Sequence, residues 1–151
     1  MKKLSPVKAA ILLLILITAA VAAFYLTTRA AVPEGALRVE FAGGKAAELS
    51  LEELDLISVR GTVVNAKGEE HAVDAQGILL SDVLRVAGAA GYSMVTVTAD
   101  DEYSAQVTAE EIADPGKVYL VQQEAGGMQL IVFGDKNSKR NVSSVVRLFV
   151  Q

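Results

Sequence analysis

The sequence predicts an α+β domain, with a mixed or antiparallel sheet and short helices, preceded by one N-terminal transmembrane helix. Three observations lead to this prediction. Residues 9–28 carry no charged side chain. After residue 36, short runs of alternating apolar and polar residues recur between Gly, Asn, Asp and Pro turns. The few helical patterns among them are short, and they do not alternate regularly with the strands.

The N-terminal run is AAILLLILITAAVAAFYLTT, and an uncharged apolar segment of about 20 residues can cross the hydrocarbon core as a helix. Three lysines precede it, whereas only Arg29 comes between it and Glu34. This charge bias predicts that residues 1–8 are cytoplasmic and that the rest of the chain after the anchor is extracytoplasmic.

A cleaved signal peptide is the alternative for the same segment. Residues 20–22, AVA, fit a small-residue cleavage site, with residues 11–17 as the apolar centre. The apolar run continues through Leu26, which favours an uncleaved anchor. Under either interpretation the domain is exported, through a linker at residues 29–36, and the folded part is expected at residues 37–151.

The composition of the 151-residue chain excludes several classes of site and partner. The chain has no cysteine, so it has neither disulfides nor thiolate ligands for zinc or iron–sulfur clusters. After residue 8 there are 11 Lys and Arg against 18 Asp and Glu, a formal charge of −7. A domain of this charge repels a phosphate backbone, so no nucleic-acid partner is expected.

The first half of the domain reads as strands joined by turns. Residues 37–42, LRVEFA, alternate and predict a half-buried strand that ends at Gly43. Ser50 followed by Glu53 has the spacing of a capping box, which predicts one or two helical turns. Residues 56–64 and 70–75 then form a predicted hairpin, in which Gly61 marks a bulge or a close approach of another segment.

The second half begins with a unit at residues 77–112. Apolar residues between 78 and 87 recur at helical spacing and end at Gly88. Strands are predicted at 94–99 and 103–107, joined by an acidic turn, and Thr108 with Glu111 predicts a capped helix. Further strands are predicted at 118–122, 128–133 and 145–150, with a polar and mostly basic loop at 134–141.

Three segments of this half resemble motifs of one family. They are residues 77–88 (GILLSDVLRVAG), residues 95–104 (VTVTADDEYS), and residues 130–150, which include LIVFG and then RNV. In this order they resemble the molybdopterin-binding domain of the sulfite oxidase family of oxidoreductases. The resemblance covers about residues 37–151 and implies that family's fold, with molybdopterin as a possible cofactor.

The chain departs from the family pattern at positions that carry the family's chemistry. Catalytic members ligate molybdenum through a cysteine, and this chain has none. Ser143 stands where the family has a lysine that helps to hold the pterin phosphate, and Glu102 replaces a glycine. The resemblance therefore implies the fold more strongly than the cofactor, which is left unknown.

Lys136, Lys139 and Arg140 form a basic cluster in this acidic domain and are the first candidates for binding an anion. Arg60, beside Gly61, is a further candidate. Tyr103 matches the family's tyrosine, so a packed, hydrogen-bonded hydroxyl is expected, with ligand contact as a secondary role. The competing interpretation of the basic cluster is a solvated turn kept soluble by its charges.

Two other polar features favour structural interpretations. His71 is the single histidine and has no ligand partners nearby in sequence, so a surface strand histidine is expected. The acidic turn at residues 100–102 lacks the ligand spacing and glycine of a calcium loop. It is expected to be a solvated hairpin turn.

We therefore expect a membrane-anchored extracytoplasmic binding domain that is non-catalytic and binds a pterin-like or other anionic small ligand. A ligand-free protein-interaction module of the cell envelope is the alternative. A molybdenum-dependent oxidoreductase is the least favoured interpretation, because it would require a metal ligand other than cysteine.

Overall fold

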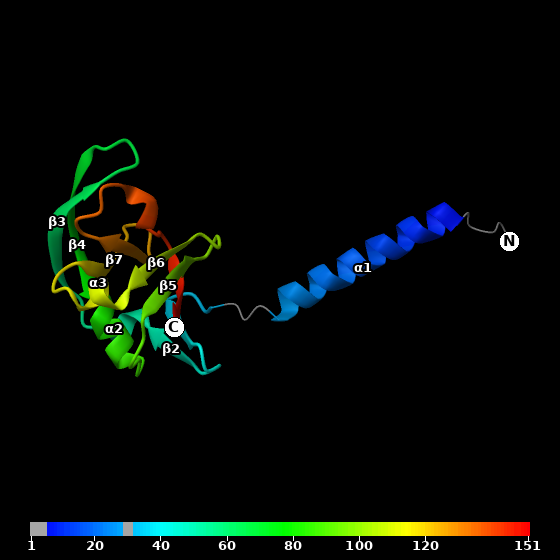
Figure 1. Cartoon of the computed structure of the whole chain (residues 1–151), viewed down its shortest axis with the longest axis horizontal. Helices are drawn as coiled ribbons and strands as arrows, with labels where there is room; N and C mark the ends of the chain where they lie inside the picture. The colour runs from blue at the N-terminus through cyan, green and yellow to red at the C-terminus, as the bar shows by residue number, and fades with distance from the viewer. Residues whose placement is uncertain (1–5, 29–31) are drawn as a thin grey trace. The chain divides into compact units, whose positions relative to one another are not determined.

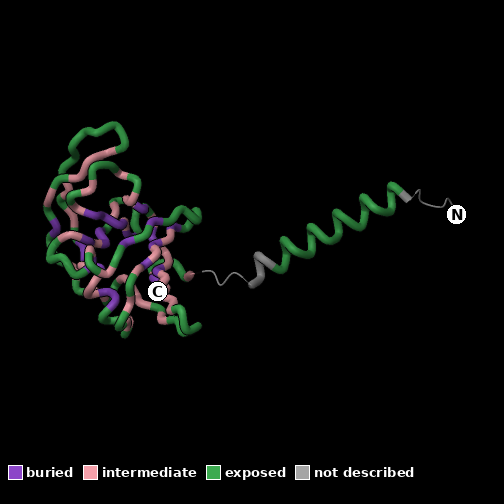
Figure 2. Tube along the Cα trace, viewed as in Figure 1, coloured by how far each residue is buried: buried purple, intermediate pink, exposed green. Residues whose placement is uncertain are grey.

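The computed structural model describes residues 6–28 and 32–151, which form an N-terminal helix and a compact unit from Val32 to Gln151 (Figure 1). The helix, α1 (Pro6–Thr28), contains the segment Val7–Phe24, whose mean hydropathy is 2.6. Its side chains in that segment are exposed throughout (Figure 2). The predicted apolar helix is confirmed, and it is long and apolar enough to cross a membrane. Arg29 and the first lysines, on which its predicted orientation depends, lie outside the described residues, as do residues 29–31 of the predicted linker.

The compact unit is α+β and contains two sheets, as the sequence predicts. The five-stranded sheet has the order β2-β1-β9-β5-β6 and the four-stranded sheet has the order β3-β4-β7-β8. The strands are β1 (Ala36–Phe41), β2 (Ala46–Ser50), β3 (Ile57–Val64), β4 (Glu70–Leu79), β5 (Met94–Ala99), β6 (Ser104–Thr108), β7 (Val118–Gln122), β8 (Met128–Val132) and β9 (Val145–Val150). The helical elements are η1 (Leu51–Glu53), α2 (Leu80–Val86), α3 (Ala109–Ala113) and η2 (Ser138–Arg140).

The larger sheet joins the two ends of the compact unit. β9, the last strand, lies between β1 and β5, parallel to β1 and antiparallel to β5. Every other strand pairing in the described part of the chain is antiparallel. The sheet is therefore mixed, and its centre is assembled from segments that lie far apart in the sequence.

One contiguous apolar core connects both sheets with α2 and α3. It takes Leu37 and Val39 from β1, Leu120 from β7 and Leu148 from β9, all of them fully buried. Figure 2 shows the buried residues gathered in the middle of the compact unit. Side chains alternate between the two faces of a strand. The residues that lie between these core positions therefore point to the opposite face of each sheet.

The long hairpin of β3 and β4 belongs to the same sheet as β7 and β8, through the pairing of β4 with β7. Val59 of the hairpin packs with Val121 and Ile131 in a second, smaller apolar cluster. A Cβ added to Gly61 would lie 2.5 Å from the Phe133 ring, so glycine is required for this contact. The β3–β4 register passes through Gly61 unbroken, which confirms the predicted close approach and excludes the bulge. The tip of the hairpin extends beyond the other strands in Figure 1.

Two sequence predictions about local structure are wrong. Ser50 does not cap a helix, because it ends β2, a strand that the sequence pattern missed, and its side chain makes no capping hydrogen bond. The segment after it forms the single 3-10 turn η1. Ile78 was expected in the helix, but it continues β4 and pairs with Leu120, so α2 begins two residues later, at Leu80.

Other local predictions are confirmed. The hairpin of β5 and β6 forms across the acidic turn. Thr108 caps α3, with Glu111 completing the capping box in both directions. The order of strands after residue 115 is also as predicted, with the basic loop containing the short turn η2.

Candidate functional site

The predicted basic loop is built around an arginine that is fully engaged by carboxylates. The Arg140 guanidinium donates from Nε to Asp135 Oδ2 at 2.8 Å. It also donates to both carboxylate oxygens of Glu111, at 2.8 and 2.9 Å. Its third partner is the Gln106 carbonyl, which accepts from Nη1 at 3.4 Å and connects the loop to the edge strand β6. Arg140 thus holds the loop to α3 and β6, and its charge is neutralised within the protein.

The same hydrogen bonds shift the pKa values of Glu111 and Arg140. Hydrogen bonding from Arg140 lowers the pKa of Glu111 to about 2, against the raising effect of burial. Hydrogen bonds from Asp135 and Glu111 raise the pKa of Arg140. Glu111 also accepts from the Thr108 backbone N–H at 3.1 Å, so one side chain serves both the helix cap and the ion pair. Lys117 lies 4.0 Å from it.

Tyr103 brings the acidic turn to the basic loop. Its hydroxyl donates to the Lys139 carbonyl at 2.5 Å, while its side chain remains 50% exposed. The expected hydrogen-bonded hydroxyl is therefore present, with the basic loop as its partner, whereas the expected packing is wrong because half of the side chain is exposed. The side chains of Lys136 and Lys139 are exposed, with no salt-bridge partner among the described residues.

The remaining predicted residues lie elsewhere. Arg60 is on the outward face of β3 and pairs with Asp74 of β4 at 3.2 Å, with both side chains well exposed. His71 lies near the hairpin tip, with its Nε2 2.8 Å from the Asn65 amide. Among the described residues, no group of three or more His, Cys, Asp or Glu is arranged to hold a metal ion.

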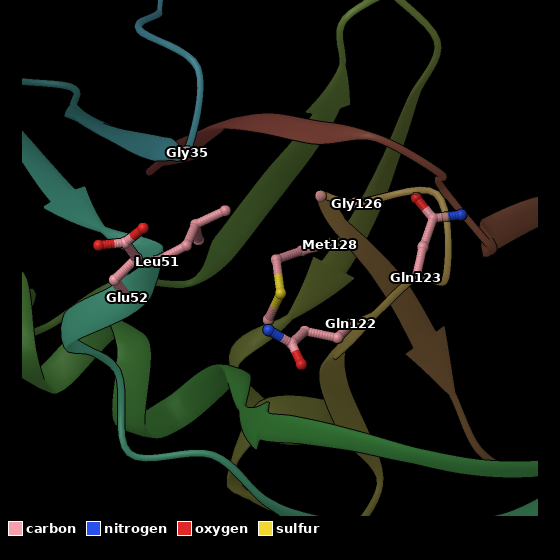
Figure 3. Close-up of a pocket in the computed structure, with 8 residues that line it drawn as sticks. Gly35, Leu51, Glu52, Gln122, Gln123, Gly126 and Met128 are labelled. Atoms are coloured by element: carbon pink, nitrogen blue, oxygen red, sulfur yellow. The ribbon is translucent and has the colours of Figure 1, made fainter.

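A small pocket of about 190 Å³ lies between η1 and the β7–β8 turn (Figure 3). In Figure 3, Leu51 and Glu52 approach it from one side and Gln122 with Met128 from the other. The Gln123 side chain has a structural role, because its Oε1 accepts a hydrogen bond from the Ser144 backbone N–H at 3.0 Å. A second pocket of about 120 Å³, beside α2, contains the ion pair of Asp82 and Arg85. Both are smaller than the roughly 300 Å³ at which ligand sites begin.

A larger hollow of about 300 Å³ lies where β1, β2 and β9 meet. We call it the β1–β9 groove; its lining residues are Arg38, Glu40, Phe41, Ala42, Gly44, Lys45, Ala46 and Phe149. Arg38 donates to Glu40 at 2.7 Å and to Glu48 at 3.3 Å. Lys45 is exposed at the turn between β1 and β2. The groove therefore combines cationic and aromatic side chains at the lower end of the size range of ligand sites.

Arg147 stands beside this groove without a complete set of hydrogen bonds. It is the register partner of Arg38 across the β1–β9 pairing. Its Nε is buried and has no hydrogen-bond acceptor in the described structure, and the nearest Glu40 oxygen is 3.9 Å away. A buried N–H donor without an acceptor is unusual in a folded protein, and this one lies next to the groove through the pairing of Arg147 with Arg38.

The sequence analysis missed this groove, although one signal was present. Arg38 and Glu40 occupy the polar positions of a predicted alternating strand, and Arg147 lies in another. What the sequence could not show is that these strands are neighbours and parallel, which places Arg38 beside Arg147.

The comparisons with known proteins add no family to this description: no protein-family model matches the chain, and no curated protein matches it. The arrangement itself can bind an anion electrostatically.

Proposed function

We propose that this chain is a membrane-anchored, non-catalytic binding protein that takes a small anionic ligand in the β1–β9 groove. The observation that carries the proposal is a groove of about 300 Å³ that is lined by Arg38 and Lys45, with the partly exposed Arg147 beside it. The proposal includes α1 as the anchor and an extracytoplasmic position for the compact unit, as the N-terminal lysines predict.

The charges around the groove support an anion. Arg38, Lys45 and Arg147 contribute three positive charges, against two from Glu40 and Glu48. This small local excess of positive charge stands out in a domain whose formal charge is −7. Guanidinium groups bind phosphate and carboxylate oxygens with paired hydrogen bonds, so the ligand is expected to carry such a group.

Two aromatic side chains add a preference for a planar ligand. Phe41 and Phe149 line the groove, and a guanidinium or an aromatic face can stack on a flat heterocycle. An anionic pterin-like compound satisfies both requirements, and so does any small aromatic acid or phosphate ester. The ligand class is therefore a planar anion.

The residues expected from the family resemblance do not fit molybdopterin as they stand. Arg140 is committed to Asp135 and Glu111, so a pterin phosphate would have to displace two carboxylates. The chain also has no cysteine with which to ligate molybdenum. We derive no reaction through that cofactor. The basic loop stays a prediction of a second anion site, through Lys136 and Lys139.

The test is binding of three probes to the purified full chain in detergent: inorganic phosphate, a pterin carboxylate and a neutral pterin. Calorimetry and thermal unfolding should show that the anionic pterin binds more tightly than the neutral one. Arg147→Met should weaken that binding about tenfold or more, the loss of one charged hydrogen bond.

A paired control separates the groove from the basic loop. The double variant Lys136→Ala with Lys139→Ala should leave the affinity unchanged. If it removes binding while Arg147→Met does not, the ligand site is the loop. If none of the three probes binds, and protein purified from its source contains no pterin fluorescence after oxidation, the binding function is rejected in favour of a ligand-free interaction module.

A further inference from the structure

We propose that the free edge of β3 is a self-association site, where two copies of this chain pair their β3 strands antiparallel. The four edge strands of the two sheets are not equivalent. At β8, Leu130 donates its N–H to the Val142 carbonyl, so the following segment covers that edge. At β6, Arg140 reaches the Gln106 carbonyl. The edge strand β2 is short, with five residues.

β3 differs from these edges in length and in receiving no backbone hydrogen bond from a described segment outside its own hairpin, and its one charged residue, Arg60, pairs with Asp74 of the neighbouring strand. It has eight residues, and its described backbone groups make no hydrogen bond outside the β3–β4 hairpin. Proteins protect such edges with proline, inward charges or bulges. β3 has no proline, its inward residues are Val59, Gly61 and Val63, and its register is unbroken. An edge of this kind can accept another strand.

The hairpin geometry identifies which backbone groups point outward. Asn65 donates to Glu69 and accepts from Gly68, so residue 65 belongs to a hydrogen-bonded pair. Because such pairs alternate in an antiparallel ladder, Val63, Gly61 and Val59 bond to β4. The even-numbered residues of the strand, 58, 60, 62 and 64, therefore direct their N–H and C=O groups away from the hairpin.

A second copy of β3 is complementary to this row. With Gly61 of each copy on the two-fold axis, the outward groups of residues 58–64 face those of the other copy over the length of the strand. On the inner face Val59 would lie opposite Val63 of the second copy, which extends the smaller apolar cluster across the axis. On the outer face Arg60 would lie opposite Thr62, so like charges are not directly opposed.

Two further features favour a second copy of this chain as the occupant. An antiparallel pairing of one strand with itself is closed by a two-fold axis and leaves no edge for further growth. Chains held in one bilayer by the proposed anchor would also meet at a raised effective concentration. The product is a continuous eight-stranded sheet formed from two four-stranded sheets.

Single-cysteine cross-linking of the full chain in nanodiscs or detergent tests the pairing, because the natural chain has no cysteine. Thr62→Cys places the two thiols diagonally across the axis, within reach of a short bifunctional maleimide. Ser104→Cys, on the exposed start of β6, is the matched control. We expect at least about tenfold more cross-linked dimer for Thr62→Cys, and equal yields would overturn the proposal.

A proline variant tests the same edge without a cross-linker. Thr62→Pro removes an outward N–H but no β3–β4 hydrogen bond, so it should yield monomers by light scattering, whereas Thr62→Ala remains dimeric. A wild-type chain that stays monomeric at tens of micromolar overturns the proposal. A Thr62→Pro dimer as stable as the wild type also overturns it, by placing the association elsewhere. If Thr62→Pro fails to fold, the cross-linking ratio decides.

Discussion

Two arginines on this domain have opposite surroundings. Arg140, in the basic loop, donates to Asp135 and to both oxygens of Glu111. Arg147, on β9, has a buried Nε without an acceptor and a carboxylate oxygen 3.9 Å away. The two side chains are similarly exposed, at 28% and 25%. Accessibility therefore does not distinguish them, whereas their hydrogen-bond partners do.

The difference in hydrogen-bond partners between Arg140 and Arg147 indicates which of the two regions is better suited to bind a ligand. An arginine whose donors are satisfied by the protein stabilises the native state and has little left for a ligand. An arginine with a buried donor that lacks an acceptor lowers stability slightly, and the exposed part of its side chain is available to a ligand. The ion pairs of Arg140 thus form a structural clasp in the basic loop, and our proposal places the ligand in the β1–β9 groove.

The largest effect is expected from removing the satisfied arginine. Arg140→Met leaves the half-buried carboxylates of Asp135 and Glu111 without their partner, so unfolding free energy should fall by about 2–4 kcal/mol. Urea denaturation measures it. Arg85→Met is the matched control, because Arg85 pairs with Asp82 on an exposed helix face, and should change stability by about 0.5 kcal/mol or less. Equal losses in the two variants would contradict the comparison.

Acid should weaken the same clasp. The pKa of Glu111 is lowered from 4.5 to about 2, so the stabilisation is fully present above pH 4.5 and is lost as the pH falls towards 2. After allowance for solvent screening we expect about 2 kcal/mol from this group. Urea unfolding at a series of pH values measures the loss, and the difference between wild type and Glu111→Gln isolates it from the other carboxyls. A difference that does not vary between pH 4.5 and 2 would show that Glu111 titrates normally.

Tyr103 should contribute less than either carboxylate to holding the loop. Tyr103→Phe removes the hydrogen bond to the Lys139 carbonyl but keeps the ring. Because the side chain is half exposed, unfolding free energy should fall by only about 0.5–1 kcal/mol. Thermal unfolding, with hydrogen exchange of the loop amides, gives the measurement. A loss as large as that of Arg140→Met would mean that the tyrosine, and not the ion pair, holds the loop.

The smallest stability effect is expected at the unsatisfied arginine. Arg147→Met removes a buried donor that lacks an acceptor, and the lost contacts of the aliphatic stem offset the gain. The unfolding free energy should change by no more than about 0.5 kcal/mol in either direction. If urea denaturation shows a loss above about 2 kcal/mol, Arg147 has partners that make it structural, and the comparison fails.

Local sequence patterns predicted much of this fold. The alternation in residues 37–41, the Thr108 capping box and the stop at Gly88 each depend on neighbouring residues, and each was read correctly. The errors occurred where a distant segment decides the local structure. Ser50 has the spacing of a helix cap, yet its pairing with Ala36 keeps it in β2. Ile78 fits a helical face, but its pairing with Leu120 extends β4.

The candidate site was less predictable for the same reason. The basic loop was visible because Lys136, Lys139 and Arg140 are close in sequence, but their proximity did not reveal that Glu111 neutralises Arg140. The groove was invisible because Arg38 and Arg147 are separated by most of the domain and meet only through strand pairing. A cluster of basic residues in the sequence shows only that positive charges are close together. The fold determines which of those charges are neutralised by carboxylates and which can still bind an anion.

The central position of β9 has a consequence for how the chain acquires its structure. β1 is the first strand to be synthesised and β9 the last, yet they are neighbours, and β5 completes its pairing only with β9. The five-stranded sheet therefore cannot close until β9 has been synthesised. Until then the hairpins β1–β2 and β5–β6, which pair strands adjacent in the sequence, lack the strand that joins them.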